Sequence, residues 1–194
     1  MKNQSQKSNE YWMQQALDIA EKALERGEFP VGCILVSGGM IVGRGGRLNS
    51  RGHMENELDH AEIQAIRDWI ARGKPGGLGF TAYTTLEPCL MCTGALILSG
   101  AGRIVYSYED VMGGAAGLNF NKSFSRGCLQ VEQARSGHLY RDFNNRIEGA
   151  VLRERSLGLF QRFFSNPGNR YLKGSLLETY TLSLQPREKI SKDL

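Results

Sequence analysis

The sequence predicts a three-layer α/β domain with a mixed central sheet. Two observations carry this prediction: a pair of short apolar strands linked by glycine near the N-terminus, and an alternation of helical and strand patterns after it. Such an alternation places helices against the faces of a sheet. With 194 residues, the chain is long enough for one domain to bury a substantial core.

The N-terminal part predicts a helix and then a β-hairpin. Apolar residues recur at helical spacing from Tyr11 to Arg26, and Gly27 follows where a C-terminal cap is expected. The stretch PVGCILVSGGMIVGRG, residues 30–45, predicts two strands joined by Gly38 and Gly39. Glycine at the turn positions suits the two-residue turns of hairpins.

Helices and strands alternate in the middle of the chain. HAEIQAIRDWIARG, residues 60–73, predicts a helix with Asp59 as its N-cap. FTAYTTL, residues 80–86, is rich in β-branched and aromatic residues and predicts a strand. PCLMCTGALILSG, residues 88–100, predicts a helix with Pro88 at its first position.

The C-terminal part predicts two further elements and a tail. RIVYSY, residues 103–108, predicts a strand, and residues 145–164 predict a short strand end followed by an amphipathic helix. A Pro-Gly pair then ends that helix. We therefore expect one domain over residues 9–165 and a C-terminal extension of uncertain order over residues 166–194.

The composition favours a soluble protein of the cytoplasm. No apolar run approaches the roughly 20 residues of a membrane-spanning helix, and the polar N-terminus lacks the apolar core of a signal peptide. We therefore expect no membrane partner. The four cysteines are unevenly spaced, which argues against a disulfide framework.

The net charge of +4 is mildly basic, and basic residues are frequent towards the C-terminus. Two interpretations stay open for them: a solvated helix face followed by a tail, or an edge that contacts phosphates. The residues concerned are Arg141, Arg146, Arg153, Arg155, Arg162, Arg170, Lys173, Arg187, Lys189 and Lys192.

Two of the cysteines, Cys89 and Cys92, lie three positions apart at the start of a predicted helix. On a helix they share one face, and the unpaired N–H groups and the dipole of the first turn favour thiolates. A redox pair of the thioredoxin kind has the same spacing but needs no third ligand. A further ligand elsewhere in the chain therefore decides between a redox pair and a metal site.

His60 and Glu62 provide a third ligand and a base. His60 lies at a predicted loop-to-helix junction, and with Cys89 and Cys92 it forms a set of nitrogen and sulfur donors that suits zinc with an open position for water. Glu62 is left unligated and can take a proton from that water and return it to a leaving group. H-x-E combined with P-C-x-x-C is the signature of zinc-dependent nucleobase deaminases. A structural zinc site or a redox pair is the alternative.

The chain resembles the cytidine deaminase-like superfamily, and within it the bacterial tRNA-specific adenosine deaminases. The similarity runs from about Tyr11 to Phe164 and rests on GEFPVGCILV, DHAEIQAIR, YTTLEPCLMCTGALILSGAGRIVYS, GGAAG and RIEGAVLRERSLGLFQRFF. The resemblance implies the α/β/α fold of that superfamily, a Zn²⁺ cofactor and a homodimer.

The resemblance also assigns roles to individual residues. It implies that His60, Cys89 and Cys92 bind zinc and that Glu62 transfers the proton. The residues that it implies for substrate binding are Asn49, Ala61, Leu86 and Glu87.

The substrate implied is adenosine at the wobble position of the tRNA anticodon arm, with inosine as the product. Two segments depart from the family: residues 56–59 replace an Asp-Pro-Thr-like stretch, and residues 118–145 form a longer loop than usual. Because such segments select the substrate, a free nucleobase or nucleoside, such as cytosine or guanine, is the alternative. A catalytically silent zinc-binding subunit is a third hypothesis, against which the intact Glu62 argues.

Overall fold

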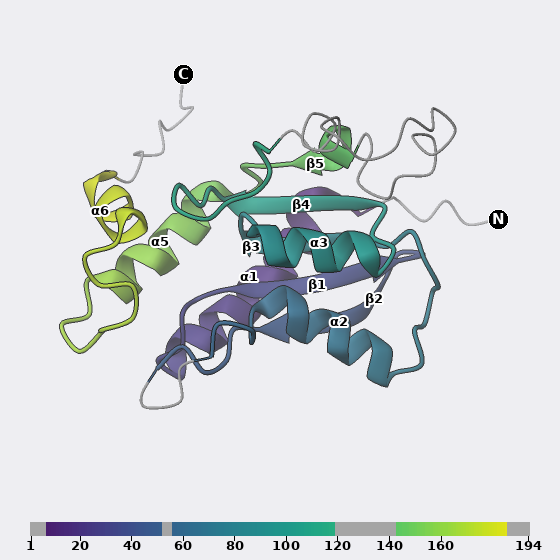
Figure 1. Ribbon diagram of the computed structural model, residues 1–194, viewed down its shortest axis with the longest axis horizontal. Coiled ribbons are helices and arrows are strands. Elements are labelled where there is room, and N and C mark those ends of the chain that lie inside the picture. Colours follow the sequence, from purple (N-terminus) through teal and green to yellow (C-terminus); the bar gives the residue numbers. More distant parts are fainter. Residues whose placement is uncertain (1–6, 52–55, 119–142, 186–194) are drawn as a thin grey trace, which may run out of the picture.

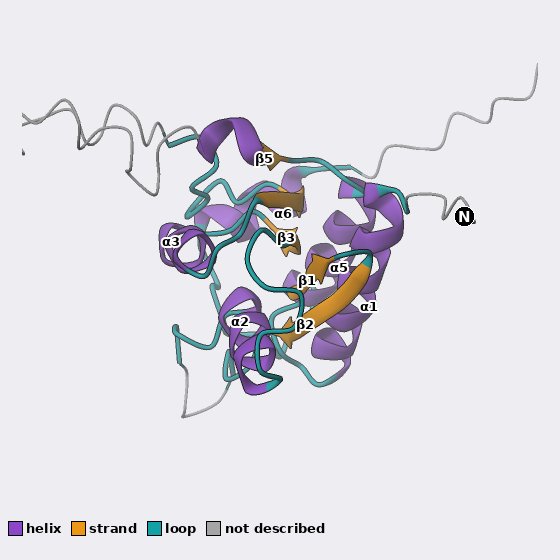
Figure 2. Ribbon diagram, turned by 90° about the vertical axis from the view of Figure 1, so that its right-hand side faces the viewer, coloured by secondary structure: helices purple, strands orange, loops and turns teal. Residues whose placement is uncertain are grey.

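The computed structural model describes residues 7–51, 56–118 and 143–185, and these form three layers (Figure 1). The helices α2 and α3 cover one face of a central sheet, and α1 and α5 lie on the other side (Figure 2). The three-layer α/β prediction is confirmed. In chain order the elements are α1 (Asn9–Glu25), β1 (Gly32–Ser37), β2 (Met40–Gly46), α2 (Ala61–Ala71), β3 (Thr81–Leu86), α3 (Leu90–Leu98), β4 (Arg103–Tyr108), the 3₁₀ helix η3 (Phe143–Arg146), β5 (Ile147–Glu148), α5 (Arg153–Phe164) and α6 (Leu176–Ser183). Among the described helices, none is both long enough and apolar enough to cross a bilayer.

The central sheet has the strand order β2-β1-β3-β4-β5. β1 is antiparallel to both of its neighbours, whereas β3, β4 and β5 are parallel, so the sheet is mixed as predicted. β2 and β3 therefore run in the same direction on either side of β1. The helices that follow them, α2 and α3, consequently begin at the same edge of the sheet.

Glycines allow the hairpin turn and the close packing of α2. Gly38 and Gly39 have φ values of +56° and +73°, which a two-residue turn of the I′ type requires. A Cβ atom at Gly45 of β2 would lie 2.1 Å from the carbonyl oxygen of Ala61, a distance that no side chain can occupy. The first turn of α2 therefore rests directly on the backbone of β2.

Apolar side chains fill the space on both sides of the sheet. A layer that includes Met13 and Leu17 lies between α1 and the sheet, and a larger layer that includes Trp69 lies beneath α2 and α3. The larger layer continues into an aromatic cluster at the edge where α2 and α3 begin. In this cluster the ring of Phe29 lies 5.2 to 6.0 Å from four other ring centroids, those of Phe160, Phe163, Phe164 and Tyr171.

The start of α2 differs from its prediction by one residue. His60, and not Asp59, is the N-cap, and it has extended backbone angles. The Asp59 carboxylate is engaged elsewhere, because it accepts hydrogen bonds from the side chains of Asn49, Asn56, Gln64 and Arg67. Asp59 therefore ties the preceding loop to α2 without capping the helix.

The start of α3 also differs from its prediction. The helix begins at Leu90 with Cys89 as the N-cap, so Pro88 precedes the helix and is not its first residue. The chain stays extended through Cys89, which forms an isolated β-bridge with Gly114. The Pro88 carbonyl accepts a hydrogen bond of 3.0 Å from the N–H of Ala115. These contacts with a loop distant in sequence keep the chain extended at Cys89, so the helix begins only at Leu90.

The C-terminal extension is described through residue 185 and packs against the domain. It contains α6, whose N-cap Ser175 accepts a hydrogen bond from the N–H of Glu178. Tyr171 and Leu177 are buried, and the Thr181 and Tyr108 hydroxyls are hydrogen-bonded at 3.1 Å. Most of the long loop over 118–145 and the basic residues Arg141, Arg187, Lys189 and Lys192 lie outside the described residues.

Candidate active site

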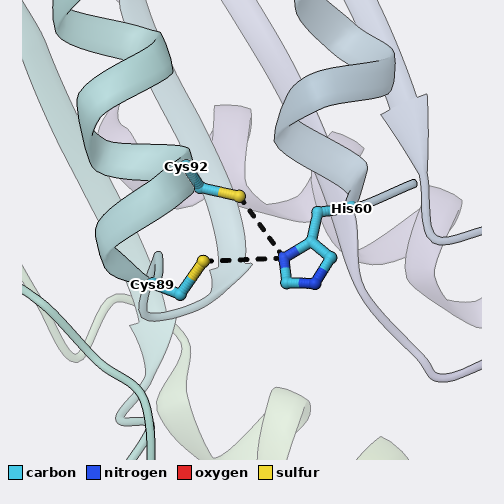
Figure 3. Close-up of side chains that lie close together, drawn as sticks. All are labelled: His60, Cys89 and Cys92. Atoms are coloured by element: carbon cyan, nitrogen blue, oxygen red, sulfur yellow. Dashed lines mark hydrogen bonds between the residues drawn. The ribbon is translucent and has the colours of Figure 1, made fainter. Parts of the chain in front are cut away.

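Three side chains with metal-binding atoms meet at the starts of α2 and α3 (Figure 3). His60 and Cys89 are the N-caps of the two helices, and Cys92 lies one turn into α3. His60 Nδ1 is 3.4 Å from Cys92 Sγ and 3.7 Å from Cys89 Sγ. All three donor atoms lie within 4.8 Å of one another. The structure therefore brings together the three residues for which the sequence predicts metal binding.

This donor set fits a zinc ion. One imidazole nitrogen and two thiolates are common zinc ligands, and three protein ligands leave a fourth position for water. Cys33, Cys89 and Cys92, the cysteines that the structure describes, form no disulfide. His60 Nε2, on the opposite side of the ring, lies 3.6 Å from Glu57 Oε2. A carboxylate in that place is what orients metal-binding histidines in other proteins.

The two thiols differ in how readily they ionise. A hydrogen bond from Cys92 and another with His60 lower the pKa of Cys89 to about 4, although burial opposes this shift. The same contact between the two thiols, together with burial, raises the pKa of Cys92 well above its usual range. Cys89 is therefore the thiol of the pair that ionises more readily, and the thiolate is the form that binds metals.

Glu62 lies beside these three residues in the first turn of α2. Its side chain is buried, and Oε1 accepts a hydrogen bond of 2.7 Å from the Thr84 hydroxyl. Burial raises the pKa of Glu62. A carboxyl group that is buried in this way and held in one orientation can both accept and release a proton during catalysis.

A pocket of about 160 Å³ opens at this edge of the sheet. A cavity of about 150 Å³ holds a benzene ring, so this pocket has room for a planar base rather than for a nucleotide with its neighbours. His60, Glu62 and Cys89 line it. The predicted substrate-binding residues that line it are Ala61, Leu86 and Glu87.

Asn49, the fourth predicted substrate-binding residue, does not line the pocket. It is exposed and has a left-handed backbone with φ of +54°. Its side-chain amide donates a hydrogen bond of 2.7 Å to Asp59 Oδ2. The turn at Asn49 therefore directs this side chain to the start of α2, and substrate binding by Asn49 stays a prediction.

Glu87 organises the loop that supports the first cysteine. Its carboxylate accepts hydrogen bonds from the N–H groups of Asp110 at 3.2 Å and Ala116 at 2.9 Å. Gly114 packs against it so closely that a Cβ atom would lie 2.4 Å from Glu87 Cδ. Because Gly114 also forms the β-bridge with Cys89, this contact fixes the turn that carries the thiol.

The pocket residues that the sequence did not predict include Arg47, Glu57 and Tyr171. The Arg47 side chain is 2% exposed, and its Nη2 donates to Glu57 Oε2 at 3.1 Å and to Tyr171 Oη at 3.0 Å. The signal for Arg47 is its place directly after β2, at the edge where α2 and α3 begin. Tyr171 has no such signal, because it comes from the C-terminal extension.

Comparison with known proteins agrees with this geometry. Residues 6–108, more than half of the chain, match the family described as the cytidine and deoxycytidylate deaminase zinc-binding region. The chain belongs to this deaminase family. The matched region contains His60, Glu62, Cys89 and Cys92, and membership of a zinc-binding family agrees with the donor set of the site.

Relatives of this deaminase include enzymes described as tRNA-specific adenosine deaminases. The one from Streptococcus pyogenes serotype M18 is 38% identical over 135 residues, which cover 64% of this chain and 84% of the relative. The one from Bacillus subtilis strain 168 is 35% identical over 159 residues, which cover 80% of this chain and 88% of the relative.

Solved structures show the same fold. A chain from a study of A-to-I editing by tRNA:A34 deaminases matches this deaminase with a TM-score of 0.58 and 27% identity, over 77% of this chain and 98% of that chain. The protein NE0047 in complex with 2,6-diaminopurine matches with a TM-score of 0.61 and 20% identity, over 84% of this chain and 85% of that chain. The cytidine deaminase-like fold is therefore confirmed.

Proposed function

We propose that this deaminase converts adenosine at the wobble position of tRNA to inosine. In this proposal His60, Cys89 and Cys92 bind zinc, and Glu62 transfers the proton. The observation that carries it is the buried Glu62 carboxyl, which lines the same pocket as His60 and Cys89, two of the three potential ligands. The relatives described as tRNA-specific adenosine deaminases support the choice of base and of polymer.

The residues of the pocket suffice for hydrolytic deamination once zinc is bound. Zinc in such a site lowers the pKa of a water molecule to about 7. The Glu62 carboxylate accepts a proton from the attacking water and gives it to the amino group at C6 of adenine. The water oxygen would first add to C6; the C–N bond would then break, ammonia would leave with the proton that Glu62 delivers, and hypoxanthine would remain. Thr84 orients Glu62 by donating a hydrogen bond to its Oε1.

The size of the pocket supports entry of a single base. We propose that Ala61, Leu86 and Glu87 contact this base, because they line the pocket next to the metal-binding group. An adenosine within the anticodon loop would have to leave its stack to enter, as it does in other enzymes that react with a base.

The proposal is tested by incubating zinc-loaded protein with an anticodon stem-loop that carries adenosine at the wobble position. We expect inosine, detected by mass spectrometry, from the wild type and none from Glu62→Ala with its zinc content unchanged. Glu25→Ala, an exposed change at the end of α1, is the control and should retain full activity. Equal activity in Glu62→Ala would contradict the role of Glu62. A zinc-loaded wild type that forms no inosine would contradict the tRNA substrate.

A free base is the second candidate substrate, and one observation favours it. Tyr171, Leu172 and Leu177 of the C-terminal extension line the pocket, so the extension closes the pocket on one side. A pocket closed in this way suits a small substrate that enters without a polymer. Ammonia release from adenine, guanine, cytosine and their nucleosides distinguishes this candidate from the first.

We also propose a homodimer that forms through the outer face of α3. Leu90 and Leu98 of this helix are 60% and 64% exposed, and Ile70 on the neighbouring α2 is 49% exposed. Large apolar side chains that gather on neighbouring elements mark a protein interface. Leu90 is the first residue of α3 and follows Cys89, which lines the pocket, so a partner that covers Leu90 would lie near the pocket.

The division of the chain and its compartment are part of the same proposal. We assign residues 9–165 to the deaminase domain and residues 166–194 to an extension whose described part packs on that domain. A tRNA substrate supports a cytoplasmic location.

A further inference from the structure

A groove separate from the pocket lies at the β2 edge of the sheet, where α1 and α2 flank the strand (Figure 2). Its volume is about 490 Å³, compared with about 160 Å³ for the pocket. Residues of α1, β2 and α2 line it. Basic side chains outnumber acidic ones in this lining: the basic residues are Lys22, Arg26, Arg44 and Arg67, and the acidic residue is Asp68.

Three of these basic side chains have no acidic partner. Lys22, Arg26 and Arg44 are exposed, and in the part of the chain that the structure describes none of them forms a salt bridge. The other two charges in the lining differ, because Arg67 and Asp68 are each paired with a residue of opposite charge. The groove therefore carries three uncompensated positive charges.

These three side chains lie on the same side of β2. A Cβ atom at Gly46 would lie 3.1 Å from a side-chain carbon of Ile19 in α1 and 3.7 Å from Arg26 Nη2. Side chains two residues apart on a strand point to the same face, so Arg44 also projects towards α1. Lys22 and Arg26 are four residues apart and therefore share one face of that helix. The charges thus converge from two elements on one groove.

Structural reasons explain these charges only one element at a time. Cations near the C-terminal end of a helix interact favourably with its dipole, which accounts for Lys22 and Arg26. A charged side chain on an edge strand hinders pairing with another sheet, which accounts for Arg44. Neither reason explains why three like charges surround one groove, where they repel one another. An anionic partner relieves this repulsion.

The groove adjoins the segment that carries His60. Gln64 and Arg67, which line the groove, donate hydrogen bonds of 2.9 and 3.0 Å to Asp59, the residue before His60. Arg67 is about 10 Å from His60 along the axis of α2. One strand of a duplex has a phosphate about every 3.4 Å along its axis. This spacing allows one RNA strand to reach both the pocket and the groove.

We propose that this groove binds the phosphate backbone of the RNA whose base occupies the pocket, and that Lys22, Arg26 and Arg44 each contact a phosphate. This inference rests on the proposed function, because it takes an RNA strand to be the substrate. Lysine and arginine bind phosphates without regard to sequence, and such contacts position a nucleic acid on a protein. The groove thereby holds the anticodon arm while the pocket receives a single base.

The test measures the affinity of the zinc-loaded protein for an anticodon stem-loop with inosine at the wobble position, a product that the enzyme does not consume. Fluorescence anisotropy at several salt concentrations gives the slope of log K against log salt. The groove variant combines Lys22→Gln, Arg26→Gln and Arg44→Gln. We expect its slope to be smaller in magnitude by about 2 to 3, and its binding at about 0.1 M salt to be about 10-fold to 100-fold weaker.

A matched control removes three positive charges elsewhere on the surface. Lys7→Gln, Arg155→Gln and Arg162→Gln together change the net charge equally, and none of these residues lines the groove or the pocket. We expect this control to keep the wild-type slope. Because Arg155 and Arg162 are among the basic residues towards the C-terminus, the control also tests the alternative that those residues contact the phosphates.

Two further measurements separate the groove from the pocket. With an adenosine stem-loop, the groove variant should have a raised KM and an unchanged kcat, because the groove contributes binding and lies away from the reacting atoms. Free hypoxanthine should bind to the groove variant as tightly as to the wild type, because it has no phosphate. A fall in kcat of the same size as the loss of stem-loop affinity would contradict the proposed role.

The outcomes distinguish this inference from the proposed function. An unchanged slope in the groove variant, or an equal change in the control, would overturn the role of the groove. Polyglutamate that binds as tightly as the stem-loop would assign the groove to an acidic protein and overturn the choice of RNA. Absence of inosine from the wild type would count against the proposed reaction alone, because the slope is measured without turnover. The single variants, each expected to change the slope by about 0.7 to 0.9, keep the inference testable if the triple variant does not fold.

Discussion

The hydroxyl of Tyr171 donates a hydrogen bond of 3.0 Å to Glu57 Oε2, although 114 residues separate the two. The same carboxylate oxygen lies 3.6 Å from His60 Nε2. One carboxylate therefore connects the C-terminal extension to the histidine of the candidate metal site. Because His60 Nδ1 faces the two cysteines, Glu57 can hold the ring in the orientation that metal binding needs.

This connection predicts that Glu57→Ala binds zinc more weakly. Loss of a carboxylate that orients a metal-binding histidine typically lowers metal affinity by about 10-fold to 100-fold. Competition with a chromophoric chelator measures the change. Glu21→Ala, which removes an exposed partner of Arg162, is the control and should leave the zinc affinity unchanged. Wild-type affinity in Glu57→Ala would show that Glu57 does not orient His60.

Thr84→Val should slow catalysis without removing zinc. The substitution keeps the shape of the side chain and deletes the hydroxyl that donates to Glu62 Oε1. A hydrogen bond to a charged group contributes about 1.5 to 3 kcal/mol, so kcat should fall by at least about 10-fold. Steady-state kinetics and metal analysis on the same sample check this. The companion variant Thr81→Val, on the same strand, should behave as the wild type; an equal loss in both would point to a general effect on β3.

Zinc should bind at a ratio of one ion per chain and should be needed for activity. Cys92→Ala is expected to lose the metal, whereas Cys33→Ala is expected to keep it, because Cys33 lies in the core of β1 away from the three ligands. Metal analysis after gel filtration gives the ratio. Inosine formation should stop after treatment with a chelator and return when zinc is added. Undiminished activity in fully chelated protein would exclude the proposed site.

Phe29→Ala should destabilise the fold strongly. Phe29 is buried and contacts the rings of α5 and of Tyr171. Truncation of a buried phenylalanine costs about 3 to 5 kcal/mol in the free energy of unfolding. Urea denaturation measures it, with Leu78→Ala as the comparison, because Leu78 is 76% exposed and should change stability by less than about 0.5 kcal/mol. A similar small effect at Phe29 would mean that the aromatic cluster contributes little.

Leu98→Glu should disrupt the proposed dimer. A charge in the middle of an apolar interface remains without a partner, which disfavours association. Light scattering coupled to gel filtration should report a dimer for the wild type and a monomer for Leu98→Glu. Met40→Glu, an equally exposed apolar position at the tip of the hairpin, should stay dimeric. If Leu98→Glu stays dimeric, the interface lies on another face.

The elements with local signals follow their predictions closely. The two glycines of the hairpin, the apolar spacing of α1 and the β-branched run of β3 each act over a few neighbouring residues, and each element forms where the pattern indicates it. The H-x-E and C-x-x-C motifs likewise identify His60, Cys89 and Cys92, which the fold brings together. The spacing within each motif is enough to identify these residues, because the two helices that carry them start at the same edge of one sheet.

Features that depend on distant contacts could not be predicted. Cys89 stays outside α3 because Gly114 pairs with it, and the PCxxC stretch alone does not contain that information. Arg47 lines the pocket and Asn49 does not, because a left-handed turn directs Asn49 to Asp59. The place of Tyr171 depends on Phe29 and Arg47, both far away in the sequence.

The absence of a side chain at Gly45 determines where the first turn of α2 lies relative to the sheet. His60 and Glu62 lie on the same turn of α2, and that turn sits on β2 only because Gly45 leaves room for the Ala61 carbonyl. The positions of His60 and Glu62 are therefore linked, because a displacement of the helix moves both side chains together. Transfer of this site to another protein scaffold would require β2 with Gly45 as well as the H-x-E motif. The motif alone does not specify the distance between the helix and the sheet.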